Sequence, residues 1–443
     1  MNLFSRNPPG PIAPAGLHHY RRGSARIHLR VGRDGSGVLA IDASKIVHLN
    51  RTACDIAWLV LEGVPRREAV KRIRSLYRTG PGRAGADIDS VGRAIDAFLD
   101  GGSACPVEFL GLDRLEPFSM PVEAPFRADL ALTYRCNVDC LHCYNGDRES
   151  TELSTDSWRR IMGILWDAGV PHAAFTGGEA TLRDDLPDLI AHAESLGMVA
   201  GLLTNGVRLA ERSYLDSLAG AGLDYVQITL ESPEESVHDG MTRSDSFART
   251  VEGLRNTVAA GMYAITNTTL TRLNAATAAG MPGFLKELGV GAFAMNSIIH
   301  SGRGPTSGVE LSADETRGIL LRVKSEADRL GMRMIWYSPT RYCDLDPVSL
   351  GLGPKRCTAG QYNICVEPDG SVIPCQSYYM KAGNLLTDSW DSIYNSSLFR
   401  SIRDRDRLGE ECTGCPDRDL CGGGCPLPAG GSGVACPDML SNP

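Results

Sequence analysis

The chain has 443 residues, a formal net charge of −8 and 42% hydrophobic residues. This composition is typical of a folded protein, and the length predicts two or three domains. Because binding to nucleic-acid phosphates needs a basic face, the acidic balance argues against a general nucleic-acid binder. Cysteine is the unusual residue, with 14 copies in the chain.

These cysteines could form disulfides or bind metals. The N-terminus has no unbroken apolar stretch typical of a secretory signal, and no run of about 18 apolar residues predicts a membrane span. We therefore expect a cytoplasmic protein with reduced thiols, in which clustered cysteines are metal ligands or catalytic groups. Two isolated cysteines, Cys54 and Cys105, are expected to be buried apolar thiols.

The N-terminal region predicts a small domain. Residues 1–24 are rich in Pro and Gly, and we expect them to form a flexible arm. The predicted strands that follow are 25–31, 37–42 and 44–50, and the predicted helices are 51–62, 66–78 and 87–100. This order indicates an α+β domain over 25–102 that resembles a winged helix-turn-helix.

A second resemblance fits the same segment better. The residues GVLAID…VHLNRTACDIAWLVLEGVPRREAVKRI are similar to the PqqD-like peptide-binding chaperones, also called RiPP recognition elements. The resemblance implies that the leader of a precursor peptide binds as an extra strand beside Ile46–Leu49. Four arginines could attract an acidic leader or could simply be solvated, namely Arg21, Arg22, Arg26 and Arg30.

Beyond a proline-rich linker at 103–125, strand and helix patterns alternate. The predicted strands are 127–134, 173–177, 198–206, 224–230, 263–270, 291–299 and 332–337. The predicted helices are 154–168, 183–196, 208–221, 246–260, 273–287 and 312–330. This succession predicts an α/β fold with a parallel sheet, either an open barrel or a doubly wound sheet.

The motif CNVDCLHC follows the first strand of this series and contains Cys136, Cys140 and Cys143. An iron–sulfur cubane normally takes four thiolates and a structural zinc ion takes four ligands, so three cysteines leave one position open. His142 lies in the short gap between two cysteines and is a poor fourth ligand. Active sites of βα barrels lie at the carboxyl ends of the strands, so an open site there is a catalytic arrangement.

The CxxxCxxC spacing resembles the hallmark of the radical S-adenosylmethionine (SAM) superfamily. The resemblance implies a partial (β/α)6 TIM barrel over 126–335, a 4Fe–4S cluster on the three cysteines, and SAM on the fourth iron. An external electron donor, such as flavodoxin or ferredoxin, would supply the electron that cleaves SAM. The resulting 5′-deoxyadenosyl radical would take a hydrogen atom from the substrate.

Motifs after the next strands match that family in their order. The GGE motif of FTGGEATL implies a carboxylate for the SAM ammonium group, and Arg243 implies a partner for the SAM carboxylate. The expected SAM contacts are Thr176, Gly177, Gly178, Glu179, Asn205, Thr229, Glu231 and Arg243. Each motif alone is also common in turns or on surfaces.

Seven C-terminal cysteines resemble the SPASM extension of radical enzymes that mature peptides and proteins, expected here at 336–443. Zinc ribbons also use CxxC pairs, but iron–sulfur clusters suit a thiolate set without histidine. The resemblance implies an outer auxiliary 4Fe–4S cluster on Cys412, Cys415, Cys421 and Cys436. It implies an inner auxiliary cluster on Cys357, Cys375 and Cys425.

The fourth ligand of the inner cluster stays open at this point. Cys343 or Cys365 could supply it, or the iron could bind a substrate thiolate. Cys365 could instead be a packed thiol, and Cys343 could donate a proton or a hydrogen atom. Relatives that form formylglycine in sulfatases carry Asp directly after the cysteine that matches Cys375, where this chain has Gln376, which cannot act as a base.

These patterns favour an enzyme that forms a radical crosslink (carbon–carbon, carbon–oxygen or thioether) in a ribosomally made peptide. One alternative is a radical enzyme acting on a small cofactor precursor or haem. Another is a zinc-stapled, winged-helix DNA-binding regulator. Asp344, Asp346 and Glu231 are the acid–base candidates for the radical enzyme.

Overall fold

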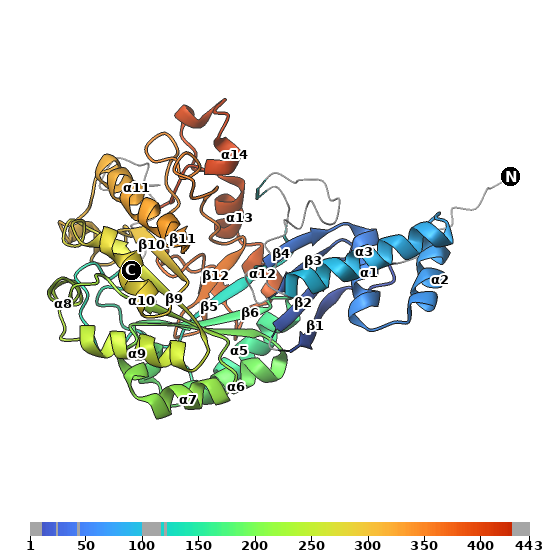
Figure 1. Ribbon diagram of the computed structural model, residues 1–443, viewed down its shortest axis with the longest axis horizontal. Coiled ribbons are helices and arrows are strands. Elements are labelled where there is room, and N and C mark those ends of the chain that lie inside the picture. The colour runs from blue at the N-terminus through green and yellow to red at the C-terminus, as the bar shows by residue number, and fades with distance from the viewer. Residues whose placement is uncertain (1–10, 24, 42–44, 100–116, 119–121, 428–443) are drawn as a thin grey trace. The chain divides into compact units, whose positions relative to one another are not determined.

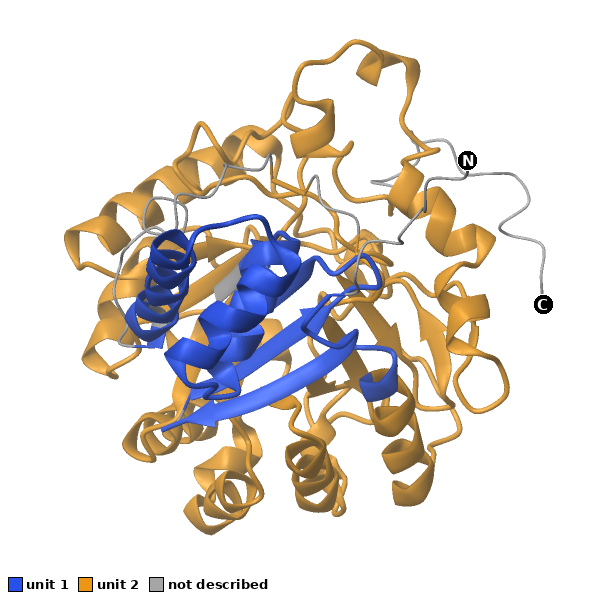
Figure 2. Ribbon diagram, turned by 90° about the vertical axis from the view of Figure 1, so that its right-hand side faces the viewer, with its two compact units in different colours: residues 1–116, 166–171 blue, residues 117–165, 172–443 orange. Residues whose placement is uncertain are grey.

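The structure is a computed structural model that describes residues 11–23, 25–41, 45–99, 117–118 and 122–427. Cys105, Cys436 and most of the expected linker lie outside the described residues. The chain divides into two compact units, which Figure 2 distinguishes by colour. Unit 1 comprises residues 1–116 and 166–171, and unit 2 comprises residues 117–165 and 172–443.

Unit 1 contains an antiparallel sheet in the order β1-β2-β3-β4. Its strands are β1 (Gly16–Arg22), β2 (Ala25–Val31), β3 (Gly37–Ile41) and β4 (Lys45–Leu49). The prediction of a flexible arm over residues 1–24 is wrong for β1, which pairs with β2 along its whole length. An edge strand is held by main-chain bonds, so β1 needs no alternating apolar pattern, and its mostly polar sequence gave no signal.

Three helices complete unit 1: α1 (Arg51–Leu61), α2 (Arg66–Leu76) and α3 (Pro81–Leu99). Helix α3 begins at Pro81 rather than at residue 87, because proline is well suited to a first helical turn and the expected glycine-rich loop continues the helix. Cys54 on α1 is fully buried in the core with Ile27 and Leu39, which confirms its prediction as a packed thiol.

Three of the four arginines of the N-terminal region lie away from β4, whereas Arg30 on β2 interacts electrostatically with His48 on β4. Arg21 and Arg22 are on β1, the opposite edge of the sheet, and Arg26 is on the neighbouring strand β2. Arg22 lies 2.9 Å from Asp96, and Arg26 is only 5% exposed. The prediction of a basic surface along β4 is therefore wrong for Arg21, Arg22 and Arg26, because the strand order, which sequence proximity does not reveal, separates them from β4.

Unit 2 is built on a sheet in the order β11-β10-β9-β8-β7-β6-β5-β12-β13-β14. All neighbours from β11 to β12 are parallel, whereas β13 pairs antiparallel with both β12 and β14. The strands are β5 (Arg127–Ala131), β6 (His172–Thr176), β7 (Val199–Thr204), β8 (Tyr225–Thr229), β9 (Tyr263–Leu270), β10 (Ala292–Ser297), β11 (Arg333–Trp336), β12 (Asn363–Val366), β13 (Ser371–Ile373) and β14 (Gly383–Asn384).

Each strand from β5 to β10 is followed by a helix, which confirms the partial (β/α)6 barrel. These helices are α5 (Thr155–Asp167), α6 (Leu186–Leu196), α7 (Arg212–Gly220), α8 (Glu235–Thr242), α9 (Phe247–Ala259), α10 (Met281–Glu287) and α11 (Ala313–Arg329). Figure 1 shows α5, α6, α7 and α9 along the outer face of the curved sheet. All five residues of β6 are buried, as expected for a parallel strand covered on both faces.

Two helix predictions in unit 2 need correction. The helix expected at 273–287 is shortened to α10, because the Asn274 side chain accepts the Thr271 N–H at 2.8 Å and holds a turn there. Helix α8 was not predicted, since its short sequence ESVHDGMT has a polar face and an internal glycine. Within the described part of the chain, every helix is too short or too polar to cross a membrane.

The cysteine-rich C-terminal region joins the barrel sheet. Strand β12 pairs in parallel with β5, from Asn363 beside Arg127 to Val366 beside Leu130. Short helices follow it: α12 (Trp390–Tyr394), α13 (Ser397–Asp404) and α14 (Arg418–Cys421). Strand β5, which precedes the first cysteine motif, is therefore a direct neighbour of β12, which precedes β13 and Cys375 in the chain.

Candidate active site

Three cysteines lie in the irregular segment that follows β5: Cys136, Cys140 and Cys143. Cys136 is exposed and the other two are partly buried. Desolvation of the sulfur raises the pKa of Cys136 to about 11 and raises the pKa of Cys140 well above its ordinary value. The thiols also interact electrostatically with one another. A bound cationic cluster would displace their protons, and three mutually close thiols suit one cluster.

Helix α8 holds this cysteine loop in place. The N–H of Asp139 donates to the carbonyl of Thr242 at 3.0 Å, and the N–H of Leu141 donates to Met241 at 2.9 Å. The helix ends at Arg243, which has a left-handed φ of 50°. The Arg243 guanidinium is half-exposed and lies 3.5 Å from the Asp139 carboxylate. Arg243 therefore lies beside the cysteine loop, where the carboxylate of a ligand could replace Asp139 as its partner.

The two glycines of the GGE motif allow β6 to approach the cysteine loop. The Gly178 N–H donates to the carbonyl of Thr133 at 2.7 Å. A Cβ on Gly177, whose φ is 140°, would lie 2.1 Å from that carbonyl oxygen. A Cβ on Gly178 would lie 2.3 Å from the carbonyl oxygen of Arg135. These glycines are thus required for contact with the chain next to Cys136, a role additional to the SAM contacts predicted for them from the sequence.

Glu179 is fixed by its neighbours. It is 1% exposed, and its Oε1 accepts from the Thr181 N–H at 3.0 Å and from the Thr204 hydroxyl at 2.8 Å. Its Oε2 accepts from the Asn205 N–H at 2.8 Å. Burial raises the pKa of Glu179, although these hydrogen bonds oppose the shift. Oε2 accepts this single hydrogen bond within the described residues, so the carboxylate can also receive a ligand ammonium group.

Other strand ends contribute polar groups at the same edge. Asn205 follows β7, and its side-chain amide donates to Asn137 in the cysteine loop at 2.6 Å. Thr176 is the buried last residue of β6, and its carbonyl accepts from Leu132 at 2.9 Å. Thr229 is the partly buried last residue of β8. The expected SAM contacts therefore converge at the carboxyl edge of the sheet.

Glu231 and His142 form a buried pair. The Glu231 Oε1 lies 3.0 Å from the His142 Nε2, and its Oε2 accepts from the Thr269 N–H at 2.8 Å. Both carboxylate oxygens are therefore occupied, which gives no support to an acid–base role for Glu231. The His142 Nε2 faces this carboxylate, and its buried Nδ1 has no hydrogen-bond partner among the described residues.

The C-terminal cysteines fall into two groups. Electrostatic interactions connect Cys357, Cys375 and Cys425, and burial raises the pKa of Cys375 to about 11 and that of Cys425 to about 12. A second set of interactions connects Cys412 with Cys415 and Cys421. This division follows the expected inner and outer sets, except that Cys436 lies outside the described residues.

The two contested cysteines lie in different places. Cys343 is exposed and interacts electrostatically with Cys412, and the adjacent Tyr342 N–H donates to the Cys421 sulfur at 3.3 Å. Cys343 thus lies beside members of the outer group, and its expected role as a ligand of the inner cluster stays a prediction. Cys365 on β12 is 1% exposed, packs against Ala131 and other apolar side chains, and interacts electrostatically with Cys375 of the inner group.

The two aspartates proposed as acid–base groups have other partners. Asp344 is exposed and lies 2.7 Å from Arg341. Asp346 accepts from the Val348 N–H at 2.8 Å and holds a turn. Neither arrangement places a carboxylate at the strand ends.

The spacing of the sulfur atoms bears on the choice of metal. Zinc binds thiolates at about 2.3 Å, so ligands of one ion lie within about 4 Å of one another. Among the described residues, no three cysteine sulfurs lie within 4.8 Å of one another, and the only such group of possible ligands is Glu235, Asp239 and Asp245. A cubane distributes its thiolates over different irons and does not need such a single-ion group.

Several polar residues beneath the cysteine loop had no sequence signal. Glu367 is 1% exposed, accepts from the Tyr134 hydroxyl at 2.7 Å and pairs with Arg148. The Arg148 guanidinium also lies 3.7 Å from the centre of the Tyr379 ring. These residues belong to segments far apart in the chain, so neither spacing nor periodicity could associate them.

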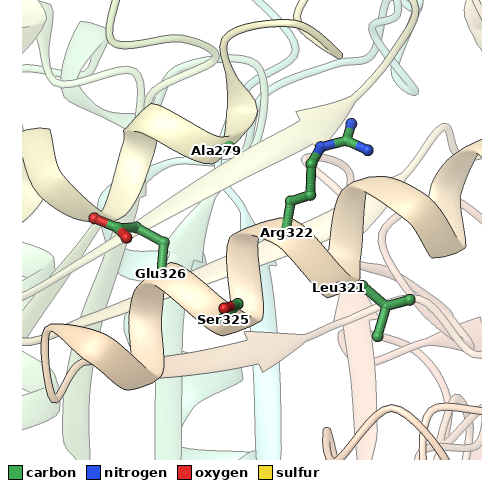
Figure 3. A pocket seen from close by; sticks show the side chains of 5 residues that line it. All are labelled: Ala279, Leu321, Arg322, Ser325 and Glu326. Carbon is green, nitrogen blue, oxygen red and sulfur yellow. The ribbon is translucent and has the colours of Figure 1, made fainter.

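A shallow depression on the outside of the barrel is separate from these groups. Figure 3 shows its lining residues on α11 and the short 3-10 turn before α10. They are Ala279, Leu321, Arg322, Ser325 and Glu326. None of the expected site residues lines it, so the strand ends, and not this depression, are the candidate site.

Comparisons with known proteins agree with this geometry. Residues 130–277 match the Radical SAM superfamily, and residues 357–416 match the iron–sulfur cluster-binding SPASM domain. The PqqA peptide cyclase of Xanthomonas axonopodis pv. citri (strain 306) is 30% identical over 319 residues, which cover 68% of this chain and 82% of the relative. The PqqA peptide cyclase of Streptomyces rochei is 29% identical over 319 residues, covering 69% and 85%.

Solved structures show the same fold. Streptococcus suis SuiB bound to its precursor peptide SuiA aligns with a TM-score of 0.67 and 15% identity, covering 93% of this chain and 96% of SuiB. The structure of anSMEcpe with bound AdoMet and the Cp18Cys peptide aligns with a TM-score of 0.54 and 18% identity, covering 68% and 89%.

The barrel and its three-cysteine loop define an iron–sulfur enzyme. The chain belongs to the radical SAM superfamily, in the group that carries a C-terminal SPASM domain. Its cofactors are 4Fe–4S clusters and S-adenosylmethionine.

Proposed function

We propose that this enzyme modifies a ribosomally synthesised precursor peptide and forms an intramolecular crosslink through a carbon–carbon, carbon–oxygen or thioether bond. The observation that carries the proposal is the three-cysteine loop fixed at the carboxyl edge of the parallel sheet. The similarity to PqqA peptide cyclases, and the shared fold with SuiB bound to a precursor peptide, favour a peptide substrate.

The chain's own residues bind and orient the cofactors. We assign Cys136, Cys140 and Cys143 to the catalytic cluster. Glu179, held by four hydrogen bonds, would orient the ammonium group of SAM. Arg243, which pairs with Asp139 in this structure, would pair with the carboxylate of SAM instead. When bound, the cluster and SAM supply the 5′-deoxyadenosyl radical. The remaining assigned SAM contacts are Thr176, Gly177, Gly178, Asn205 and Thr229, whereas the buried Glu231 would act through His142 and Thr269, which occupy its carboxylate oxygens.

The crosslink requires the removal of two hydrogen atoms from the peptide. The 5′-deoxyadenosyl radical would take one of them and become 5′-deoxyadenosine. The other would leave as a proton and an electron, and a cluster held by the C-terminal cysteines, or an external acceptor, would supply the oxidant for that electron. An external donor such as flavodoxin or ferredoxin would provide the electron that begins each turnover, which suits a cytoplasmic enzyme.

The C-terminal region 336–443 would hold two auxiliary clusters. We assign the inner cluster to Cys357, Cys375 and Cys425. The outer cluster is assigned to Cys412, Cys415, Cys421 and Cys436. Thiols that share electrostatic interactions within each group support this division.

The segment 25–102 would act as a PqqD-like element that binds the leader of the peptide. Strand β4 is the last strand of the unit 1 sheet, and within the described residues it pairs with β3 only. Its outer edge can therefore accept an added strand through main-chain hydrogen bonds. The linker 103–125 would connect this element to the barrel at 126–335.

The zinc-stapled regulator is disfavoured. Both family matches are to iron–sulfur domains. A radical enzyme for a small cofactor precursor or haem would share the barrel. The relatives named as peptide cyclases favour the peptide.

The test uses anaerobically purified enzyme with reconstituted clusters, a reductant, SAM and the short peptide encoded beside its gene. We expect the peptide to lose the mass of two hydrogen atoms while 5′-deoxyadenosine accumulates. The Cys140→Ala variant is expected to produce neither. An unmodified peptide that also fails to bind would contradict a peptide substrate, and colourless, zinc-loaded protein would contradict the cluster assignment.

A further inference from the structure

A hydrogen bond connects the residues that directly follow two assigned cluster ligands. Tyr144 follows Cys143, and Gln376 follows Cys375. The Tyr144 hydroxyl donates to the Gln376 Oε1 at 2.6 Å. The carboxamide of Gln376 therefore lies between the catalytic cysteine loop and the inner cysteine group.

Hydrogen bonds hold Tyr144 in position. Its carbonyl accepts from the Tyr379 hydroxyl at 2.8 Å, and that hydroxyl is also 3.0 Å from the Asn145 Oδ1. The Asn145 amide donates in turn to the carbonyl of Gly177 at 2.8 Å. Tyr144 is thus connected through two side chains to the GGE motif on β6, and it is not free to follow Gln376.

This hydrogen bond sets the orientation of the Gln376 carboxamide. A neutral phenol has one proton to donate, and here it goes to the amide oxygen, so the NH2 group must face the other way. The NH2 group has no hydrogen-bond partner among the described residues, and Gln376 is partly exposed. Two oriented N–H donors are therefore available to a ligand.

The chemistry of a carboxamide limits what this group can do. It donates hydrogen bonds to carbonyl oxygens, but it does not take up a proton at neutral pH. Its role is therefore binding, and a peptide that enters beside the cysteine loop presents carbonyl oxygens along its main chain.

We propose that Gln376 is a substrate-positioning residue whose N–H group donates to a main-chain carbonyl of the peptide, with Tyr144 holding the carboxamide in the required orientation. This inference rests on the proposed peptide substrate. A peptide held at this point would keep the reacting hydrogen in one place relative to the radical, so crosslinking would stay coupled to SAM cleavage.

The test compares Gln376→Glu, Gln376→Met and Tyr144→Phe with the wild-type enzyme. Glu keeps the acceptor for Tyr144 but loses the N–H donors, and Met keeps the approximate shape without polar atoms. The matched control is Tyr225→Phe, which removes a hydroxyl 2.9 Å from His172 at the opposite end of the sheet. The measurements are iron content, SAM cleavage without peptide, KM and kcat for the peptide, and 5′-deoxyadenosine formed per crosslink.

We expect both Gln376 variants to keep their iron and their peptide-independent SAM cleavage. Their KM for the peptide should rise about tenfold, as for the loss of one hydrogen bond, and more 5′-deoxyadenosine should form per crosslink. Tyr144→Phe should show the same changes to a smaller extent, and Tyr225→Phe none. Unchanged KM and coupling in Gln376→Glu, or loss of iron from the variants, would overturn the positioning role while leaving the peptide function intact. If the wild-type enzyme leaves the peptide unmodified, the proposed function and this inference both fail.

Discussion

The carboxylate of Glu231 and the imidazole of His142 form a buried pair that connects the end of β8 to the cysteine loop, with 3.0 Å between Oε1 and Nε2. The two side chains are 1% and 9% exposed, so neither can exchange its partner for water. The same carboxylate accepts from the Thr269 N–H at 2.8 Å. Glu231 therefore holds β8, β9 and the loop together.

Replacement of Glu231 by Ala should destabilise the barrel. The change leaves the His142 ring and the Thr269 N–H buried without an acceptor, which costs about 3 kcal/mol. We expect a lower thermal unfolding midpoint and a smaller yield of the catalytic cluster, measured by calorimetry and iron analysis. The control is Glu234→Ala, an exposed glutamate in the same segment, which should change neither value. Equal behaviour of the two variants would contradict the role of the buried pair.

Replacement of Gly177 by Ala tests the contact between β6 and the cysteine loop. The added Cβ would lie 2.1 Å from the Thr133 carbonyl oxygen, at a φ of 140° that disfavours any side chain. We expect loss of the catalytic cluster, seen as lower iron content and no SAM cleavage, while the auxiliary clusters remain visible by electron paramagnetic resonance. Gly163→Ala on α5 is the control, because its Cβ meets no atom within 4 Å and alanine favours a helix. A variant with full iron content would show that the loop can shift.

Replacement of Glu179 by Gln should weaken SAM binding. Both oxygens of the carboxylate accept hydrogen bonds, so an amide NH2 group would face the N–H groups or hydroxyls of Thr181, Thr204 or Asn205. Loss of the charge also removes the partner proposed for the SAM ammonium group, and we expect at least about tenfold weaker binding. Equilibrium binding of SAM to the reconstituted enzyme measures this. Glu252→Gln, on the exposed face of α9, is the control. Equal SAM affinity in the two variants would exclude Glu179 from the SAM site.

The sequence was sufficient for the features that depend on local pattern. Buried apolar runs predicted the parallel strands from β5 to β10, because strands covered on both faces are apolar throughout. The spacing of Cys136, Cys140 and Cys143 predicted the cluster loop, because ligands from one loop must be close in sequence.

The sequence was insufficient where main-chain pairing or distant contacts determine the structure. Strand β1 is held by its ladder with β2 and has no apolar alternation. The pairing of β12 with β5 joins segments that share no periodicity. The Tyr144–Gln376 hydrogen bond spans 232 positions, so only the fold brings these side chains together.

The position of Cys343 bears on whether this cysteine is the fourth ligand of the inner auxiliary cluster. Its neighbour Tyr342 donates to the Cys421 sulfur at 3.3 Å, and Cys343 interacts with Cys412, so it lies on the outer side. Cys365 interacts with Cys375, but its thiol is buried in an apolar cluster and donates to the Val366 carbonyl at 3.8 Å, so its loss would mainly remove packing. We therefore expect both single alanine variants to retain the signal of the inner cluster in electron paramagnetic resonance.

Cys365→Ala and Cys343→Ala should differ in their free energy of unfolding. Cys365→Ala removes a buried sulfur from the core beside Ala131 and should lower stability by about 1 kcal/mol. Cys343→Ala changes an exposed residue and should leave the unfolding midpoint unchanged. Loss of the inner signal in Cys365→Ala alone would instead identify Cys365 as the fourth ligand. Its loss in Cys343→Ala would show that the loop carrying Cys343 moves toward the inner group when the clusters assemble.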